Sequence, residues 1–197
     1  QNRRLNWQPG QMTVNHAQVV ICGAGIAGVS TAYFLAVRGG MKDILLVDER
    51  SPLSLTSDHS TECYRNWWPD NAMVRFMNRS IDLLEELAEE SGNYFNLNRC
   101  GYLYCTAEGA NERFMREALS ISQLTGSPLR VHSITGDQIP YTPAPTEGYR
   151  DQPGGADLLF DPVLIQECFP FLTKDIRAVL HVRRAGWLSA QQSEGQF

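Results

Sequence analysis

Two short apolar runs flank a segment with helical spacing near the start of the chain. Residues 17–22 and 44–47 are each typical of a buried parallel strand. Between them, residues 26–38 carry apolar side chains at helical spacing, at Ile26, Val29, Tyr33 and Val37. Gly39 and Gly40 follow this stretch and end the predicted helix. The pattern predicts a strand–helix–strand unit of about 30 residues.

A long amphipathic helix is predicted over residues 71–90. Most of its glutamates lie on one side, and its apolar stripe lies on the other, formed by Met73, Met77, Ile81, Leu84 and Ala88. Asp70 is suited to cap the start of this helix, and Gly92 is suited to end it. The preceding stretch, residues 51–70, is rich in Ser, Thr and Asp and predicts a loop.

The pattern of apolar positions is weaker in the second half of the chain. Residues 101–106 predict a strand, and residues 111–124 predict a helix. Beyond Ser127 the spacing matches neither period. Residues 140–155 are rich in Pro and Gly and predict a loop, and residues 161–171 predict a short helix. The sequence therefore supplies two convincing parallel strands, at 17–22 and 44–47.

Three glycines stand directly after the first predicted strand, in VVICGAGIAGVS at residues 19–30. Gly23 permits a tight turn, Gly25 lets the backbone approach a pyrophosphate, and Gly28 lets the helix pack closely on the strand. The free N–H groups at the helix start, at Ile26 and Ala27, face the anion, and the helix dipole adds to the attraction. With a strand before and a helix after it, the motif predicts a dinucleotide-binding loop.

A carboxylate ends the second predicted strand. Asp48 lies about 20 residues beyond Gly28, the spacing at which an acidic residue accepts hydrogen bonds from the ribose of an adenosine. Glu49 is the alternative, since only one of the two neighbours can point at the ribose. A carboxylate also repels a 2′-phosphate. The predicted ligand is therefore FAD or NAD.

Composition narrows the classes of function. The 197 residues carry a formal net charge of -5, which disfavours a broad nucleic-acid surface. No apolar run is long enough for a membrane span, and the first 16 residues lack the apolar core of a signal peptide. The five cysteines form no C-x-x-C pair, which argues against a zinc site and a disulfide framework. Reduced thiols indicate a reducing compartment, the cytoplasm or an organellar matrix.

Two quoted stretches, VVICGAGIAGVSTAYFLAVRGG and DILLVDERSPLSLTSDHSTECYRNWWP, carry a family resemblance. Together they resemble the FAD-dependent amine and amino-acid oxidoreductases, the D-amino-acid oxidase/sarcosine and dimethylglycine dehydrogenase superfamily. Residues 98–108 resemble the family's strand leading into the substrate domain. Residues 181–192 resemble a segment that precedes the helix returning to the flavin domain. The resemblance implies FAD as the cofactor.

In that family a loop rich in Ser and Thr follows the acidic residue and runs along the flavin. Here this loop corresponds to residues 55–65. Candidate partners of flavin phosphate or ribityl oxygens are Ser57, Ser60 and Thr61, with local turn hydrogen bonds as the alternative. Arg65 is a candidate source of positive charge near the flavin or a substrate carboxylate, with a surface arginine as the alternative.

Several other residues are interpreted as structural. Some family members tether the flavin through a His or Cys, but neither His59 nor Cys63 is assigned such a bond. Trp67 and Trp68 are interpreted as packing residues at a domain junction. Arg183 and Arg184 are interpreted as a solvated basic pair, with attraction of a carboxylate substrate as the alternative.

The resemblance implies an FAD-dependent oxidoreductase that oxidises the C–N bond of an amine or amino acid. The alternatives are an NAD-dependent dehydrogenase and a truncated, non-catalytic dinucleotide-binding module. The expected partner is a small amine or amino acid, with no nucleic acid, no membrane span and no metal. Neither catalytic residues nor protein partners are assigned.

The predicted fold class is α/β, with a Rossmann-like βαβ unit and the start of an α+β substrate domain. Residues 1–16 are a polar lead-in, residues 17–95 the FAD-binding portion, and residues 96–197 part of a substrate domain. Because few parallel strands are found, we expect an N-terminal fragment. We expect weak or absent FAD retention and no amine oxidation by these 197 residues alone.

Overall fold

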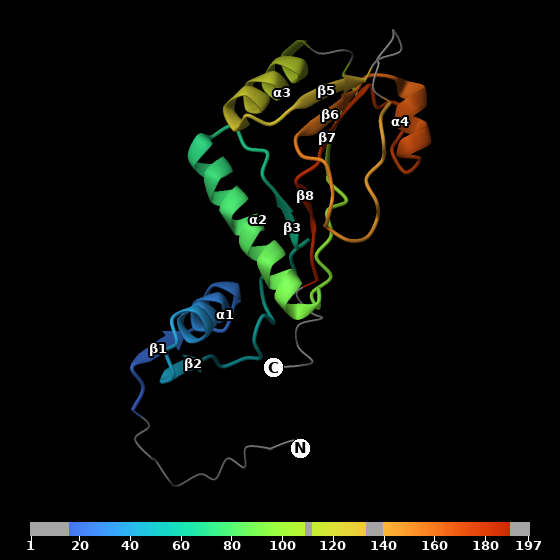
Figure 1. Ribbon diagram of the computed structural model, residues 1–197. Helices are drawn as coiled ribbons and strands as arrows, with labels where there is room; N and C mark the ends of the chain where they lie inside the picture. The colour runs from blue at the N-terminus through green and yellow to red at the C-terminus, as the bar shows by residue number, and fades with distance from the viewer. Residues whose placement is uncertain (1–15, 109–111, 133–139, 190–197) are drawn as a thin grey trace. The chain divides into compact units, whose positions relative to one another are not determined.

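The computed structural model describes residues 16–108, 112–132 and 140–189. The chain falls into two compact units, residues 1–59 and residues 60–197 (Figure 1). The domain bounds suggested by the sequence, 17–95 and 96–197, stay a prediction.

The first unit is the predicted strand–helix–strand motif. Strand β1 (Val19–Cys22) pairs in parallel with β2 (Ile44–Val47), and α1 (Ile26–Tyr33) connects them. The predicted helix over residues 26–38 is wrong in its last turn, because η1 (Phe34–Arg38) is a π-helical turn. Its widened turn is closed by the N–H of Gly39, which donates to the carbonyl of Phe34 at 2.9 Å, five residues earlier.

The two strands of this unit have an inner and an outer face. Side chains along β1 and β2 alternate between half-buried and exposed. Ile21 lies on the half-buried face, close to Gly28 of α1. Val20 and Val47 on the other face are 55% and 46% exposed. Among the residues that the structure describes in this unit, helix cover is therefore on one face of the sheet.

The second unit is built on a mixed four-stranded sheet in the order β4-β7-β6-β5. Its strands are β4 (Tyr102–Thr106), β5 (Leu129–His132), β6 (Ala156–Leu159) and β7 (Ala178–Val182). Strand β7 runs antiparallel to both β4 and β6, and β5 runs parallel to β6. The same unit contains a separate two-stranded ribbon. In this ribbon β3 (Cys63–Arg65) pairs antiparallel with β8 (Ala185–Trp187).

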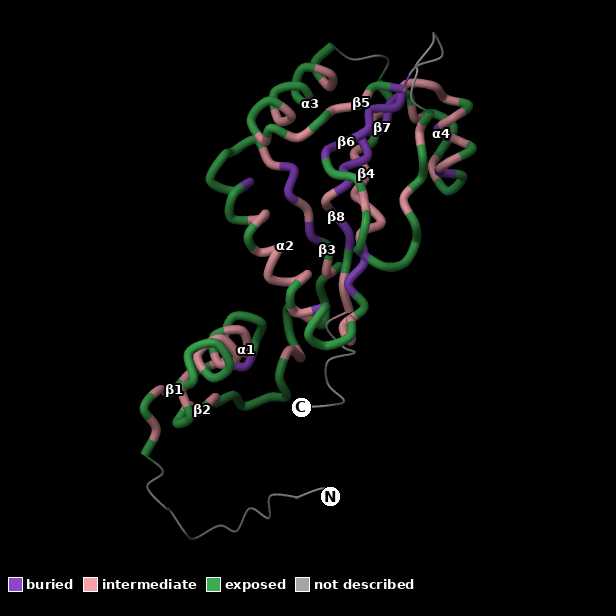
Figure 2. The backbone as a smooth tube through the Cα atoms, viewed as in Figure 1, coloured by how far each residue is buried: buried purple, intermediate pink, exposed green. Residues whose placement is uncertain are grey.

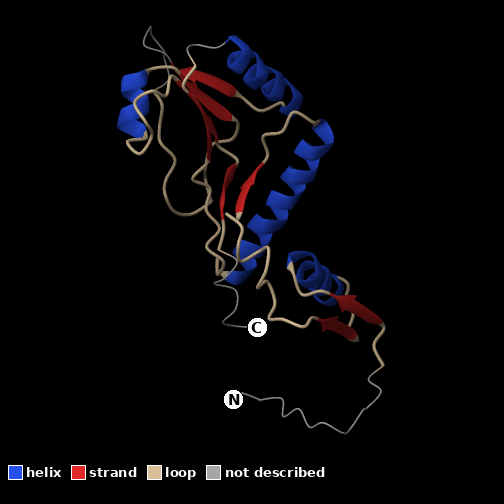
Figure 3. Ribbon diagram, turned by 180° about the vertical axis from the view of Figure 1, so that it is seen from behind, coloured by secondary structure: helices blue, strands red, loops and turns tan. Residues whose placement is uncertain are grey.

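Helices α3 (Glu112–Thr125) and α4 (Pro162–Cys168) lie on opposite sides of this sheet (Figures 1 and 3). Alternate side chains of β6 and β7 supply the two contacts. Leu158 and Leu180 pack in a cluster with Ala118 of α3. Leu159 and Val179 pack in a cluster with Ile165 of α4 and with Phe169 at its end. The central strands are therefore buried on both faces, as the purple tube in Figure 2 shows.

Helix α2 (Asn71–Ser91) confirms the long helix and both of its predicted ends. The Asp70 carboxylate accepts the Met73 N–H at 2.8 Å, and Gly92 adopts a left-handed φ of 65°. The predicted apolar stripe is slightly misplaced, because Met73 is exposed whereas Val74 is buried together with Ile81 and Ala88. Of these, Ile81 and Ala88 pack in a cluster with Tyr64 and Leu97.

Several strands were not predicted. Strand β3 lies inside the predicted loop 51–70, and β5 to β8 follow the point where the pattern blurs. Because β6 and β7 are buried along their whole length, they show no alternation, and Asp157 and His181 interrupt their apolar runs. The predicted short helix at 161–171 is observed as the shorter α4, which Asp161 caps through the Val163 N–H.

Candidate functional site

The turn between β1 and α1 depends on two glycines. Gly23 has a φ of +103°, a conformation that other residues rarely adopt, and its N–H donates to the Val47 carbonyl at 2.8 Å. A Cβ on Gly28 would lie 1.8 Å from the carbonyl oxygen of Gly23. The turn and the close approach of α1 are therefore built on Gly23 and Gly28.

Gly25 is a glycine for a different reason. It is the N-cap of α1, with an ordinary extended backbone at φ -72° and ψ -178°, and a Cβ there would meet nothing within 4 Å. Gly25 has no side chain with which to cap this helix. As at any helix start, the first-turn N–H groups of Ile26, Ala27 and Gly28 have no partner within the helix. Open space in front of unpaired donors is what a pyrophosphate requires, so the loop fits an adenine dinucleotide.

Asp48 at the end of β2 is joined to this loop. Its Oδ2 accepts the Ala24 N–H at 2.7 Å, and its Oδ1 accepts the Arg50 N–H at 2.9 Å. These hydrogen bonds lower the pKa of Asp48 and keep the side chain ionised, and the one from Ala24 has the largest effect. Glu49 is 79% exposed and pairs with Arg50 at 3.2 Å. Of the two neighbouring carboxylates, it is Asp48 that lies at the loop.

Two of the three predicted Ser and Thr ligands make local hydrogen bonds. The Ser60 hydroxyl accepts the Glu62 N–H at 3.1 Å, which is a local turn hydrogen bond. Thr61 is exposed, and its carbonyl oxygen accepts from the Cys63 thiol at 3.3 Å. Ser57 is half-buried in the first unit. The roles of these three side chains as flavin ligands stay predictions.

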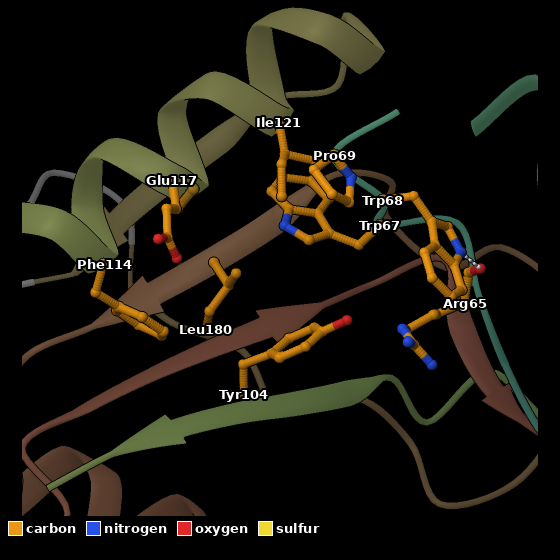
Figure 4. Close-up of a pocket in the computed structure, with 10 residues that line it drawn as sticks. Arg65, Trp67, Trp68, Pro69, Tyr104, Phe114, Glu117, Ile121 and Leu180 are labelled. Atoms are coloured by element: carbon orange, nitrogen blue, oxygen red, sulfur yellow. Dashed lines mark hydrogen bonds between the residues drawn. The ribbon is translucent and has the colours of Figure 1, made fainter. Parts of the chain in front are cut away.

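Arg65 lies among aromatic rings in the second unit (Figure 4). Its guanidinium carbon is 4.3 Å from the centre of the Trp68 ring, 5.0 Å from that of Tyr102 and 6.0 Å from that of Tyr104. Arg65 is half-buried on β3, so it is not a solvated surface arginine. It lines a cavity of about 220 Å³ together with Trp67, Trp68, Pro69, Tyr104, Phe114, Glu117, Ala118, Ile121 and Leu180.

Two buried donors beside this cavity lack partners. Within the described ranges, neither Nε of Arg65 nor Nε1 of Trp67 has a hydrogen-bond partner. A buried donor without a partner is unfavourable by about 1–3 kcal/mol. Trp67 also belongs to the core cluster around Leu158 and Leu180. Burial raises the pKa of Tyr104 and the nearby Arg65 charge opposes that rise, so Tyr104 is a neutral hydroxyl.

Tyr102 and Tyr104 were missed as site residues by sequence reasoning. They stand two apart on β4 and therefore point to the same face of the sheet, where their ring centres are 5.1 Å apart. The alternating YLY in the predicted strand 101–106 was the available signal. Their meeting with Arg65, from β3, depends on tertiary structure alone.

Comparison with known families covers both units. The FAD dependent oxidoreductase family matches residues 18–192, which is nearly the whole chain. The chain belongs to this family. The family is FAD-dependent, so the prediction of FAD is confirmed and the nicotinamide alternative is not supported. The predicted superfamily resemblance and the α/β fold class are confirmed as well.

This chain is similar in sequence to part of two curated dehydrogenases. It is 27% identical to the mitochondrial dimethylglycine dehydrogenase of Homo sapiens over 158 residues, covering 80% of this chain and 15% of that protein. The Rattus norvegicus dimethylglycine dehydrogenase is 26% identical over 161 residues, with 82% and 15% covered. The chain therefore spans less than a fifth of the length of these curated relatives.

Two solved structures share the fold. L-proline dehydrogenase from P. horikoshii superposes with a TM-score of 0.66 at 21% identity, covering 91% of this chain and 40% of that one. Glycine oxidase from Bacillus cereus gives a TM-score of 0.66 at 17% identity, covering 90% and 41%. In the described part of this chain, no helix is both long and apolar enough to cross a membrane.

Proposed function

We propose that this family member binds FAD and serves in the oxidation of a C–N bond in a small amine or amino acid. The observation that carries the proposal is the loop before α1, with open space at Gly25 and with Asp48 bonded to Ala24 at 2.7 Å. FAD, when bound, supplies the acceptor for the two electrons and the hydrogen that leave the carbon next to nitrogen.

The first unit holds the dinucleotide end of the cofactor in this proposal. The first-turn N–H groups of α1 donate to the pyrophosphate, and the extended Gly25 leaves room for it. Asp48 accepts from the adenosine ribose. Its oxygens accept backbone N–H groups from Ala24 and Arg50, with a further contribution from that of Glu49. A carboxylate has about four acceptor positions, so capacity remains for a ribose hydroxyl.

The second unit contributes Arg65 as a partner for the substrate carboxylate. The guanidinium is oriented by the rings of Trp68 and Tyr102, and its Nε lacks a partner within the described residues. A carboxylate supplies both the acceptor and the opposite charge that this donor lacks. The apolar lining of the cavity, with Phe114 and Leu180, favours a substrate with a small hydrocarbon part.

The substrate class is supported by the names of the similar proteins. They are a dimethylglycine dehydrogenase, an L-proline dehydrogenase and a glycine oxidase, so each name refers to an amino acid or N-methylated amino acid. Proline, glycine and dimethylglycine all carry a carboxylate next to the C–N unit, which agrees with a role for Arg65. The cytoplasmic location predicted from the cysteines stays a proposal, and the dimethylglycine dehydrogenases are described as mitochondrial.

The proposal is tested by the absorption spectrum of the purified flavoprotein and by its reduction under substrate. In a longer protein that contains this chain, we expect flavin bands that are released by acid precipitation, and bleaching of those bands by dimethylglycine, sarcosine, proline or glycine. For the 197 residues alone, weak or absent FAD retention and no amine oxidation stay the prediction. Protein without flavin that also binds no added FAD contradicts the cofactor assignment. Flavin that is bleached only by substrates without a C–N bond contradicts the proposed reaction.

Arg65 has its own test with a matched control. Arg65→Gln is expected to raise KM for carboxylate substrates by about tenfold or more, because a charge-assisted hydrogen bond is lost. Arg79→Gln, an exposed arginine on α2 whose side chain is 63% exposed, serves as the control. An unchanged KM in Arg65→Gln, or an equal change in both variants, shows that Arg65 does not bind the substrate.

A further inference from the structure

A second charged cavity lies in the second unit, separate from the residues assigned above. It has a volume of about 400 Å³ and is lined by Arg130, His132, Asp157 and Arg183. Its other lining residues are Pro140, Thr142, Pro143, Pro145, Asp151, Gln152 and Pro153. No residue of this cavity lines the one around Arg65.

Strand register brings the charged residues together. Arg130 of β5 lies directly opposite Asp157 of β6, so both side chains point to the same face. His132 stands two residues further along β5 and shares that face. Arg183 follows the last residue of β7, the neighbour of β6 on its other side. The cluster therefore sits on one face of the sheet, at β5, β6 and the end of β7. Figure 1 shows these strands side by side.

The Asp157 carboxylate is saturated by these neighbours. Its Oδ1 accepts from Nε of Arg130 at 2.6 Å and from Nε2 of His132 at 2.9 Å. Its Oδ2 accepts from Nη2 of Arg130 at 2.9 Å and from Nε of Arg183. Burial raises the pKa of Asp157, but the hydrogen bonds from Arg130, His132 and Arg183 outweigh burial and hold that pKa well below its usual range.

The charges in this cluster do not cancel. Two guanidinium groups face one carboxylate, which leaves one positive charge. The Arg183 and Asp157 side chains are only 5% and 2% exposed, and the interpretation of Arg183 as part of a solvated pair is wrong. Asp151 also lines the cavity but is exposed and forms no ion pair with either arginine within the described chain. The Arg130 side chain is 24% exposed and lines the cavity, so an anion that enters the cavity can neutralise the excess positive charge.

Both arginines keep donors for a further partner. Arg130 uses Nε and Nη2 on Asp157 and on the Gly154 carbonyl at 3.0 Å. Arg183 uses Nε on Asp157 and Nη2 on the Thr142 carbonyl at 2.7 Å. Among residues that the structure describes, no hydrogen bond reaches Nη1 of either arginine. The ring of Tyr141, 5.0 Å from the guanidinium carbon of Arg183, helps to hold that side chain in place.

The walls favour an organic anion over an inorganic one. The lining includes four prolines, which have no N–H to donate and whose rings are aliphatic. The volume of about 400 Å³ exceeds that of a simple inorganic ion by several-fold, since one water occupies about 30 Å³. An organic acid places its charge at the arginines and its carbon chain against the prolines.

We propose that this cavity binds a small monocarboxylate, held by Arg130 and Arg183 and distinct from any carboxylate held by Arg65. The proposal does not depend on the proposed oxidation, because it uses no residue assigned to FAD or to the substrate of that reaction. The bound carboxylate neutralises the excess positive charge of the two arginines and ties β5 to the end of β7.

The test is calorimetric titration of the protein with butyrate, with inorganic phosphate and chloride as comparison anions. We expect one butyrate per chain, a rise in Tm with butyrate concentration, and weaker binding of phosphate and chloride. Arg130→Gln is expected to raise the butyrate Kd by about tenfold or more. Arg113→Gln, an arginine on α3 whose side chain is 84% exposed, removes the same charge from the same unit and is expected to leave Kd unchanged.

Two further variants keep the test decisive. If Arg130→Gln fails to fold, Arg130→Lys preserves the charge but not the planar fork, and butyrate binding is then expected to weaken without loss of the fold. Asp137 lies outside the described residues, but it stands in the sequence between two residues that line the cavity, His132 and Pro140. It is therefore tested as Asp137→Asn. Butyrate binding that appears only in Asp137→Asn overturns the proposal, because the chain then supplies its own carboxylate. Equal affinity for butyrate, phosphate and chloride overturns it too, as does absence of binding in all variants.

Discussion

The three glycines of the turn before α1 are expected to respond differently to substitution, which separates binding from folding. A Cβ at Gly25 meets nothing within 4 Å, and its extended backbone is open to any residue. Gly25→Val should therefore fold normally but place a side chain where the pyrophosphate must lie. Losing two charge-assisted hydrogen bonds at about 1.5 kcal/mol each weakens binding by about 3 kcal/mol, or about 100-fold in Kd.

Gly28→Ala is expected to do the reverse. Its new Cβ would lie 1.8 Å from the Gly23 carbonyl oxygen and 3.0 Å from the Gly23 carbonyl carbon. The contacted atoms are backbone atoms of the turn, so α1 must move away from β1. Overpacking typically costs about 1–3 kcal/mol, and a clash with backbone belongs at the upper end of that range or above it. Because domains are stable by only about 5–15 kcal/mol, the loss is large.

The assay combines urea unfolding, followed by far-UV circular dichroism, with FAD titration followed by flavin fluorescence. Gly25→Val should keep the parent's unfolding midpoint and lose FAD affinity, whereas Gly28→Ala should lower the midpoint. If Gly25→Val binds FAD as tightly as the parent, the loop does not hold a pyrophosphate. If Gly28→Ala unfolds at the parent's midpoint, the close packing of α1 against the turn is not required for stability.

Three other predictions address single side chains. Asp48→Ala should weaken FAD binding by about 1–3 kcal/mol and leave FMN binding unchanged, whereas a loss confined to Glu49→Ala would reassign the carboxylate. The pKa of His181 is lowered from 6.5 to about 4, mainly by burial and in addition by the positive charge of Arg183. Between pH 6.5 and pH 4, His181 gains a proton in the unfolded state but stays neutral in the folded state. The free energy of unfolding should therefore fall by about 3 kcal/mol from pH 7 to pH 4. In urea titrations, His181→Gln should remove that part of the pH dependence. Asp70→Ala should lose the α2 cap and lower the unfolding free energy by about 1 kcal/mol, and an unchanged midpoint would contradict the cap.

His181 also illustrates how a buried network assigns a tautomer. Its Nε2 lies 3.1 Å from the Cys100 carbonyl oxygen, which can only accept, so Nε2 carries the proton. Its Nδ1 then accepts from the Tyr141 hydroxyl at 2.8 Å. The neutral ring is therefore hydrogen-bonded on both sides, which agrees with its lowered pKa.

Features that depend on residues close together in the chain could be predicted from the sequence. The strand–helix–strand unit, the glycine turn and Asp48 all fall within about 30 residues and follow recognised periods and spacings. The ends of α2 at Asp70 and Gly92 were readable for the same reason, because caps depend on side chains next to the helix.

Tertiary structure alone decided the four-stranded sheet and both charged cavities. Strands β6 and β7 are buried on both faces, so no alternation marked them. Arg130 and Asp157 are 27 positions apart, and they meet because β5 and β6 pair in one register rather than another. A shift of one residue would turn either side chain to the opposite face. Register between distant strands is set by the packing of the whole unit, and no short stretch of sequence contains it.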